Sequence, residues 1–419
     1  MRFLGSGRHG CGARRVEGAS PRCPVPARLL AALVAVVLAT LPALAQPTYT
    51  RWALADSIDA VLGDADFRGA RWGAHVVDLA TGEVLYSRDA YAPFIPASNM
   101  KLVTTATALD ALGPDHRIET RLYGAGTVAY GTLDGPLVVR GAGDPAFAGR
   151  RYRTELRGAF EAWADSLRQR RVRTVFGPIY VTDDAVPEPD AYFARALLDA
   201  LEDADVQVVD RTVRVVPPEA VPGDALLRLA THQSPPLAAL VRLTNEDSDN
   251  LYAERLLWAA TAAVYPGGVP HSELRSAAVG SFLRRIDVDP RMAVVADGSG
   301  LSRENRLTPV GIVELLAVMW THPSRATRQA FIDSLPVGGV TGTLERRYRR
   351  GDARGNVRAK TGYIREVRTL SGYVTTAAGR ELAFSLMCNG YSVQTSRVNR
   401  AQDAVVELLA DFEGRPPGG

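Results

Sequence analysis

Lysine is nearly absent from this sequence of 419 residues. Of the 49 basic residues, only Lys101 and Lys360 are lysine, and the other 47 are arginine. Arginine keeps its proton in proteins, whereas lysine, with a reference pKa of about 10.4, can lose it when it is buried or set beside another cation. The two lysines can therefore be functional residues that must lose a proton, or ordinary surface residues of an arginine-biased protein. Their neighbours in the sequence must decide between these two interpretations.

Cysteine is scarce as well, and its positions exclude a disulfide framework. Cys11 and Cys23 lie in the N-terminal segment, which leaves Cys388 alone in the rest of the chain. A protein without cross-links must be held together by its hydrophobic core. The composition permits such a core, since 46% of the residues are hydrophobic and 23% are charged, as in ordinary globular domains.

Histidine gives no support for two common catalytic arrangements. No histidine beyond residue 45 occurs in a zinc-binding H-E-x-x-H motif or in a nucleophile-elbow context. We therefore expect neither a Ser-His-Asp triad nor a metal or other cofactor, and we interpret these histidines as ordinary surface or core residues. They are His75, His116, His232, His271 and His322.

The N-terminus has the order of a secretory signal. Arginines precede an apolar run at 29–45, which ends in Ala43-Leu44-Ala45 before Gln46, a small-x-small cleavage site. A membrane anchor is the alternative, but the run is shorter than the roughly 20 residues that a spanning helix needs, and it contains Pro42. We expect a signal peptide at 1–45 and an exported, periplasmic or extracytoplasmic protein without a stable transmembrane anchor.

Removal of that signal also removes the excess of positive charge. The signal holds six of the basic residues and one acidic residue, so 43 basic residues face 45 acidic ones in the remaining chain. A nearly neutral chain offers no broad positive field for a polyanion. We therefore expect no nucleic-acid partner.

Hydrophobic periodicity predicts strands near both ends of the mature chain, at 72–79, 83–87, 367–376 and 380–388. Because such strands commonly meet in one antiparallel sheet, we expect a discontinuous catalytic domain at 46–120 and 226–419. Helix, strand, helix and strand follow one another between these parts, which predicts an inserted lobe at 121–225. The helical period predicts helices at 154–171, 191–204, 235–243, 250–264, 271–285, 308–320 and 395–412.

The run Gly141-Ala142-Gly143-Asp144-Pro145 resembles the start of a dinucleotide-binding loop. Position 146 is alanine, so the third glycine of that fingerprint is missing. We interpret the run as a turn.

Three short motifs carry the chemistry, and the first is Ser98-Asn99-Met100-Lys101. It precedes a helical pattern that ends at Gly113-Pro114, and residues three apart on a helix share a face. A serine hydroxyl needs a base before it becomes a good nucleophile. A neutral Lys101 is the base that this sequence offers to Ser98.

The second motif is Ser248-Asp249-Asn250, directly before an apolar helical pattern. All three residue types are favoured helix caps, so a purely structural role is the alternative. As a site, Ser248 would relay a proton and the Asn250 amide would orient the lysine or the substrate.

The third motif is Lys360-Thr361-Gly362, at the beginning of a predicted strand. It can be a plain strand end. In a site, Lys360 would supply positive charge, Thr361 a hydroxyl for an anionic substrate group, and Gly362 room for a substrate backbone. The charge of Lys360 would also lower the pKa of Lys101 if the two side chains meet.

S-x-x-K, S-D-N and K-T-G in this order are the signature of class A β-lactamases and penicillin-binding proteins, and the only two lysines fill its two lysine positions. The surrounding residues resemble the class C low-molecular-mass penicillin-binding proteins, the D-alanyl-D-alanine carboxypeptidase/endopeptidases, over nearly all of the mature chain. The matching stretches are Phe94-Ile95-Pro96-Ala97-Ser98, Gly141 to Pro145, Ser248 to Glu254, Asp297 to Arg303, Leu335-Pro336-Val337, Gly342-Thr343-Leu344 and Ala359 to Gly362.

The resemblance implies an α+β fold of the penicillin-recognising type shared by serine transpeptidases and β-lactamases, with an antiparallel sheet flanked by helices and a shortened inserted α/β lobe. It implies that Ser98 attacks D-Ala-D-Ala or D-alanyl cross-links in peptidoglycan stem peptides, with Lys101 as base and Ser248 as proton relay. Lys360 and Thr361 would hold the terminal carboxylate, and the backbone N–H groups of Ser98 and Tyr363 would form the oxyanion hole. β-Lactam antibiotics would be inhibitors at the same serine.

Two features depart from the family pattern. Only 147 positions separate Lys101 from Ser248, fewer than the family's usual span, and the shortfall lies after Thr182. Tyr363 stands where a small residue is usual, so its ring is expected to narrow the approach. Two alternatives also remain open: a serine β-lactamase or esterase on the same scaffold, for which no deacylating glutamate loop is evident, and a non-catalytic wall-binding relict.

Overall fold

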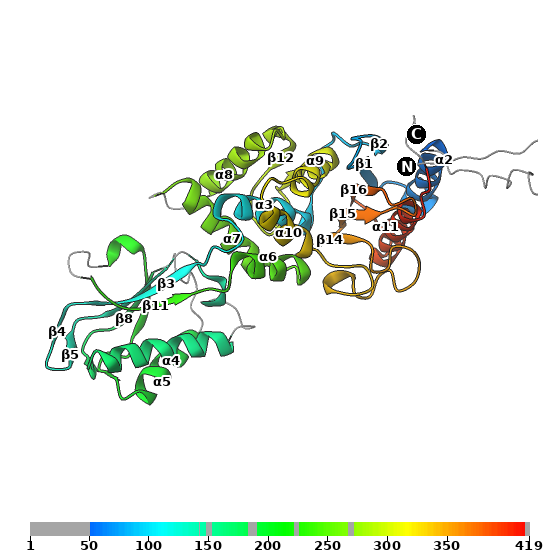
Figure 1. The fold of residues 1–419 in the computed structure, drawn as a ribbon. Helices are drawn as coiled ribbons and strands as arrows, with labels where there is room; N and C mark the ends of the chain where they lie inside the picture. Colours follow the sequence, from blue (N-terminus) through cyan, green and yellow to red (C-terminus); the bar gives the residue numbers. More distant parts are fainter. Residues whose placement is uncertain are drawn as a thin grey trace, which may run out of the picture. The chain divides into compact units, whose positions relative to one another are not determined.

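Strands from the two ends of the chain meet in one antiparallel sheet, which confirms the predicted fold (Figure 1). The computed structural model describes residues 51–141, 143–147, 153–182, 191–221, 226–266 and 272–414, and the predicted signal peptide lies outside them. The sheet order is β14-β15-β16-β1-β2. Its strands are β1 (Arg71–Asp78), β2 (Val84–Arg88), β14 (Arg358–Ile364), β15 (Val367–Thr375) and β16 (Glu381–Asn389).

Helices cover both faces of this sheet because its side chains alternate between two hydrophobic cores. On β16, Phe384 and Leu386 point into a core shared with α2 and α11, whereas Ala383 and Met387 point into a core shared with the other helices. The helices are α2 (Arg51–Leu62), α3 (Met100–Leu112), α6 (Leu237–Glu246), α7 (Asn250–Val264), α8 (Ser272–Arg285), α9 (Pro309–Trp320), α10 (Arg325–Asp333) and α11 (Thr395–Ala410).

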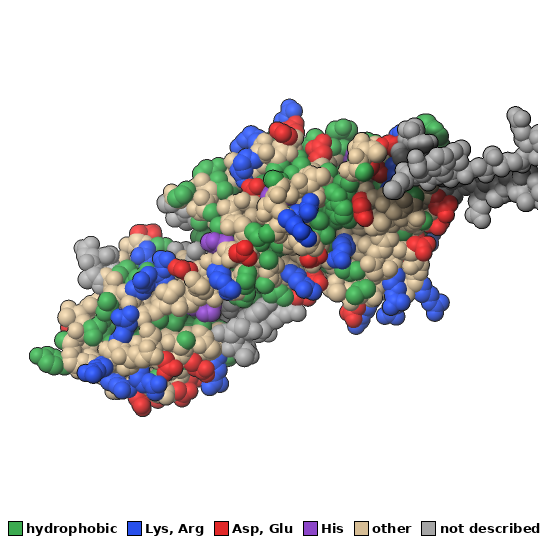
Figure 2. Space-filling model, in the orientation of Figure 1, with side chains coloured by type: hydrophobic (Ala, Val, Ile, Leu, Met, Phe, Trp, Pro, Cys, Tyr) green, Lys and Arg blue, Asp and Glu red, His purple; other side chains and the backbone are tan. Residues whose placement is uncertain are grey.

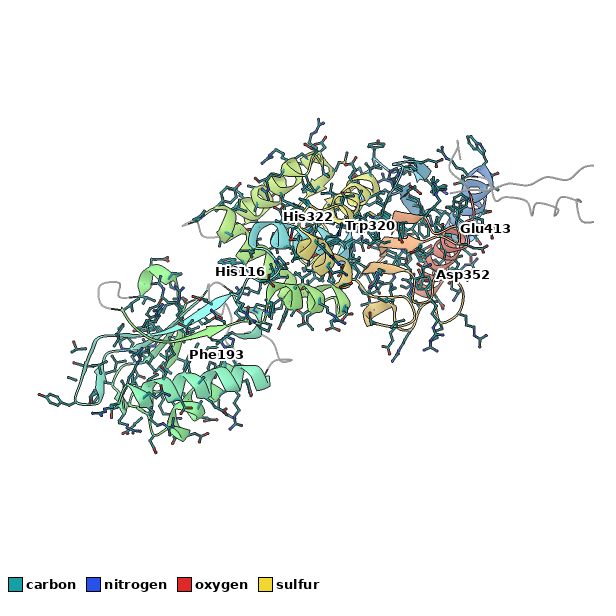
Figure 3. The ribbon with its side chains drawn as sticks, viewed as in Figure 1. His116, Phe193, Trp320, His322, Asp352 and Glu413 are labelled. Atoms are coloured by element: carbon teal, nitrogen blue, oxygen red, sulfur yellow. The ribbon has the colours of Figure 1, made fainter. Side chains whose placement is uncertain are left out.

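A second sheet forms the lobe inserted between α3 and α6, in the order β10-β8-β6-β3-β11. Helices α4 (Arg153–Gln169) and α5 (Ala191–Asp203) pack on one of its faces through an aromatic cluster that includes Phe160 and Phe193 (Figure 3). The strands of the lobe are β3 (Glu119–Ala125), β4 (Thr127–Ala129), β5 (Thr132–Asp134), β6 (Leu137–Gly141), β7 (Thr174–Val175), β8 (Ile179–Thr182), β9 (Gln207–Val208), β10 (Val213–Val216) and β11 (Leu226–Gln233).

The lobe extends further along the chain than the predicted range 121–225. Strand β11 pairs with β3 from Leu226 to Gln233, so the expected boundary at 225 falls inside the lobe sheet. The shortening that the sequence predicts after Thr182 falls at residues 183–190, which lie outside the described part of the chain.

Most predicted elements are present with small changes at their ends, and α7 has the predicted bounds. Helices α2 and α10 had no prediction. The remaining short elements are η1 (Ala65–Phe67), η2 (Ala97–Asn99), η3 (Pro145–Phe147), η5 (Pro218–Ala220), η6 (Pro290–Met292), η7 (Gly342–Leu344), β12 (Ala293–Val294) and β13 (Arg306–Leu307). None of the described helices combines the length and apolar character needed to cross a bilayer.

Candidate active site

Ser98 lies in the single turn η2, immediately before α3 begins at Met100. The turn is tightly wound, since Ala97 has a φ of +46° and the Asn99 N–H donates to the Pro96 carbonyl. A loop from far along the chain packs directly against it. A Cβ on Gly300, which has a φ of +85°, would lie 1.8 Å from the Ala97 carbonyl oxygen and 3.0 Å from the Ser98 nitrogen. Only glycine fits there.

Asp297 fixes the shape of that loop. Its two carboxylate oxygens accept hydrogen bonds from the backbone N–H groups of Gly300, at 2.6 Å, and Ser302, at 2.5 Å. Glu254 on α7 also holds this loop, because its carboxylate accepts a hydrogen bond from the Ser299 N–H at 2.8 Å. The loop and α7 therefore act as one support for the Ser98 turn.

Lys101 is completely buried one helical turn after Ser98. Its Nζ donates to Ser98 Oγ at 3.1 Å, to Asn250 Oδ1 at 2.7 Å and to the Ser299 carbonyl at 2.6 Å. An ammonium has three N–H groups, and these acceptors use all of them. When neutral, the amine keeps two donors for Asn250 and Ser299 and can turn its lone pair toward the Ser98 hydroxyl.

Burial lowers the pKa of Lys101 from its ordinary value to about 8, against the opposing charges of Asp297, Glu254 and Asp249. Burial holds the pKa of Lys360 well below its ordinary value, and the charge of Lys101 lowers it further. Burial is therefore the largest cause at both lysines, and the repulsion predicted between them acts on the pair.

Ser248 and Asn250 flank a helix cap, and their side chains reach the two lysines. Asp249 caps α7 by accepting from the Tyr252 N–H at 3.0 Å, which is the structural role that the motif allowed. Ser248, held at a φ of +58°, accepts a hydrogen bond from Lys360 Nζ at 2.9 Å. A non-glycine residue in this region carries backbone strain, and the strain here points a hydroxyl into the site.

The third motif lies inside β14, at the edge of the central sheet. Lys360 is completely buried, and the Thr361 hydroxyl donates to Thr343 Oγ1 at 2.8 Å. A Cβ on Gly362 would lie 2.1 Å from Thr369 Oγ1, 2.8 Å from the Pro96 carbonyl and 3.1 Å from the Ser98 nitrogen. The strand therefore runs in direct contact with the Ser98 turn.

The direction of the backbone N–H groups follows from the alternation along β14. The Ala359 N–H donates to the Pro336 carbonyl, away from the neighbouring strand β15. Because residues two apart in an antiparallel strand direct their backbone groups to the same side, the N–H of Tyr363 also faces away from β15. The Ser98 nitrogen lies close to Gly362, the residue before Tyr363.

Tyr363 and its cross-strand partner Arg368 form the outer edge of the site. The Tyr363 side chain is 55% exposed, and the Arg368 guanidinium lies 5.7 Å from the centre of its ring. Arg368 also donates to the Gly362 carbonyl at 3.4 Å. Burial lowers the pKa of Arg368 to about 10, and the nearby charge of Arg347 contributes.

Lys101 thus joins Ser98 to Asn250, and Gly362 lies against the Ser98 turn. Lys360 contacts Ser248, and Asp249 caps the helix. Sequence reasoning missed the roles of Ser299, Glu254 and Arg368. Within the described ranges, no group of three or more His, Cys, Asp or Glu side chains is arranged to hold a metal ion.

Comparisons with known proteins point in one direction. A family model described as the D-Ala-D-Ala carboxypeptidase 3 (S13) family matches residues 54–187 and 180–412. The D-alanyl-D-alanine carboxypeptidase of an Actinomadura species is 30% identical over 93% of this chain and 91% of that protein. The carboxypeptidase DacB of Mycolicibacterium smegmatis is 30% identical over 92% of this chain and 88% of that protein.

Among solved structures, penicillin-binding protein 4 of Haemophilus influenzae superposes with a TM-score of 0.72. The match covers 85% of this chain and 99% of that chain at 20% sequence identity. This structural similarity shows that the chain shares the fold of that protein as well as sequence similarity with the carboxypeptidases above.

Proposed function

The chain belongs to the D-Ala-D-Ala carboxypeptidase 3 (S13) family and is a serine DD-peptidase, and on that premise we propose how its residues perform the reaction. Ser98 is the nucleophile, and its target is the carbonyl carbon of D-alanyl-D-alanine in a peptidoglycan stem peptide. The observation that carries this assignment is the contact of Ser98 Oγ with the buried Lys101 Nζ at 3.1 Å. It brings together a nucleophile and a base whose pKa is lowered toward neutrality.

Acylation begins when neutral Lys101 takes the hydroxyl proton of Ser98 as the new C–O bond forms. Asn250 and the Ser299 carbonyl hold the amine by two hydrogen bonds, so its lone pair has one direction left, toward Ser98. The oxyanion that develops on the carbonyl would lie between the backbone N–H groups of Ser98 and Tyr363. A donor of this kind is worth about 3 kcal/mol in the transition state.

The C–N bond then breaks, and the departing D-alanine nitrogen needs a proton. Ser248 accepts a hydrogen bond from Lys360, which leaves its own hydroxyl hydrogen available to that nitrogen. Ser248 gives up this proton and regains one from the lysine pair. In sum, the proton of Ser98 reaches the leaving amine, and the two lysines return to their starting charge.

Lys360 and Thr361 would bind the terminal carboxylate of the substrate, and Gly362 lets the substrate backbone lie along β14. A carboxylate beside Lys360 favours the protonated lysine, so substrate binding itself would charge this side chain. Water then releases the acyl group from Ser98. We infer that β-lactams acylate the same serine and that residues 1–45 direct export to the compartment where peptidoglycan lies.

The decisive assay is incubation of the mature protein with uncross-linked and cross-linked muropeptides, read by mass spectrometry. Loss of one D-alanine marks carboxypeptidase action, and separation of joined stems marks endopeptidase action. Release of D-alanine by a Ser98→Ala variant would refute the mechanism, and no release by the parent would favour a wall-binding relict. Rapid turnover of a labelled penicillin, in place of a lasting acyl-enzyme, would favour a β-lactamase.

A further inference from the structure

Helices α4 and α5, the helices of the lobe in the described part of the chain, both pack on one face of its five-stranded sheet. Its inner side chains, such as Leu122, Val139 and Val181, pack against α4 and α5. The opposite face carries a row of residues that are in register across all five strands. In the order β10, β8, β6, β3 and β11, these are Arg214, Tyr180, Val138, Tyr123 and Arg228.

A second row on this face contains two arginines directly opposite each other. Arg121 on β3 pairs in register with Arg140 on β6, and like charges in that position destabilise a sheet. Arg121 is compensated by an ion pair with Glu119. No ion pair of Arg140 is found among the described residues. The sheet thus keeps an unfavourable cation where a hydrophobic or neutral side chain would fold better.

These arginines line a cavity of about 680 Å³. Arg117 adds a third guanidinium, fixed by its hydrogen bond to the Ser234 carbonyl at 2.8 Å, and Tyr123 adds an aromatic ring. His116 lies at the junction of the lobe with the helical region (Figure 3). The lining of the cavity thus carries three guanidinium groups and one carboxylate, that of Glu119. Figure 2 shows basic side chains on the lobe beside this junction.

We propose that this surface, defined by Arg117, Arg121, Tyr123 and Arg140, is a second binding site, for the carboxylates of a peptidoglycan strand whose stem peptide is processed at Ser98. The proposal rests on the proposed function. Guanidinium groups bind carboxylates in a bidentate manner, and a tyrosine ring offers a flat face to a sugar. The sheet tolerates the opposed arginines because a bound anion neutralises them.

The distance to Ser98 suits one polymer bound at both places. The cavity begins beyond the C-terminal end of α3, and Ser98 precedes its N-terminal end, so about 20 Å of helix separates the two. A stem peptide of five residues spans at most about 18 Å. A strand with several stems can therefore reach the cavity while one stem lies in the catalytic site.

Cosedimentation with insoluble peptidoglycan, purified free of teichoic acids, tests the proposal in a Ser98→Ala background that cannot digest its ligand. We expect Arg121→Gln with Arg140→Gln to raise the half-binding concentration about tenfold or more and to reduce the salt dependence. The matched control, Arg157→Gln with Arg168→Gln, removes the same charge from α4, on the covered face, and should bind within about twofold of the parent. Amidation of the peptidoglycan carboxylates should weaken binding of the parent as well.

Equal binding by the double variant and the parent would overturn the proposal. So would an equal loss of binding in the α4 control, or unchanged binding of the parent to amidated peptidoglycan. The thermal midpoint separates a binding defect from misfolding, because relief of the arginine pair should leave it at or above that of the parent. With Ser98 intact, the double variant should release D-alanine from a short soluble peptide at the parental rate. Failure of the parent to release it would overturn the proposed function alone, since the binding assay needs no turnover.

Discussion

The buried amine of Lys101 leads to a quantitative prediction for its replacement by arginine. A lysine with the ordinary pKa of 10.5 is neutral in about 0.03% of molecules at pH 7, whereas a pKa of about 8 makes about 10% of them neutral. A guanidinium with a pKa above about 12 is neutral in less than about 0.001%. Lys101→Arg should therefore slow acylation at pH 7 by at least about 10⁴-fold, even before the larger side chain disturbs the site.

The same reasoning fixes the pH profile of the parent. The second-order rate of acylation by a fluorescent penicillin, followed by stopped flow, should rise about tenfold per pH unit below pH 7 and level off near pH 8. Lys101→Met, which has no base, is the control for loss of packing. A flat profile between pH 6 and 8, or a Lys101→Arg variant within tenfold of the parent, would refute the role of Lys101 as base.

Three further predictions concern the neighbours of Lys101. Asn250→Asp places a carboxylate at the atom that Lys101 contacts at 2.7 Å, which should raise the pKa of the lysine. The pH range over which the acylation rate rises should then move by about one pH unit or more toward alkaline pH. An unchanged pH profile would contradict the contact. Gly362→Ala inserts a methyl group 2.1 Å from Thr369 Oγ1 and should cost about 1–3 kcal/mol in urea unfolding, together with most penicillin labelling. Gly158→Ala, where a Cβ meets nothing within 4 Å, is the control and should leave both stability and labelling unchanged or slightly raise stability. Tyr363→Ser keeps the backbone N–H and should retain penicillin labelling. It should increase the rate of cleavage of cross-linked muropeptides relative to uncross-linked ones. An unchanged ratio of these two rates would show that the tyrosine ring does not narrow the entrance to the active site.

Much of the candidate active site was predictable because the proposed chemistry depends on residue types that are recognisable in the sequence. Two lysines in an arginine-rich chain, each beside hydroxyl or amide residues, predicted Ser98, Lys101, Ser248 and Lys360 as one group. The central sheet was predictable because the strands at 71–78 and 381–389 are mainly apolar between their ends and are buried along most of their length.

Other features have no signal in the sequence. The third acceptor of Lys101 is the backbone carbonyl of Ser299, and every residue has such a group. Arg368 reaches Tyr363 only because the register of β14 on β15 sets the two opposite each other. The predicted range 121–225 ends before β11 because only one residue of this strand is buried, so hydrophobic periodicity does not mark the strand that returns to pair with β3.

The insertion point explains how the lobe can differ in length without disturbing the chemistry. The chain leaves the catalytic domain after α3 and re-enters it before α6, and the two crossings are hydrogen-bonded to each other: the Leu237 N–H donates to the His116 carbonyl at 2.8 Å, and the Ser234 N–H to the Ile118 carbonyl at 2.9 Å. Because the entry and exit are held together, residues added or lost further out in the lobe leave the ends of α3 and α6 in place. The Ser98 turn is instead fixed by Gly300 and Gly362, which follow the lobe in sequence. Changes in the lobe should therefore alter which polymer is held beside the site, whereas changes at the two glycines should alter the reaction itself.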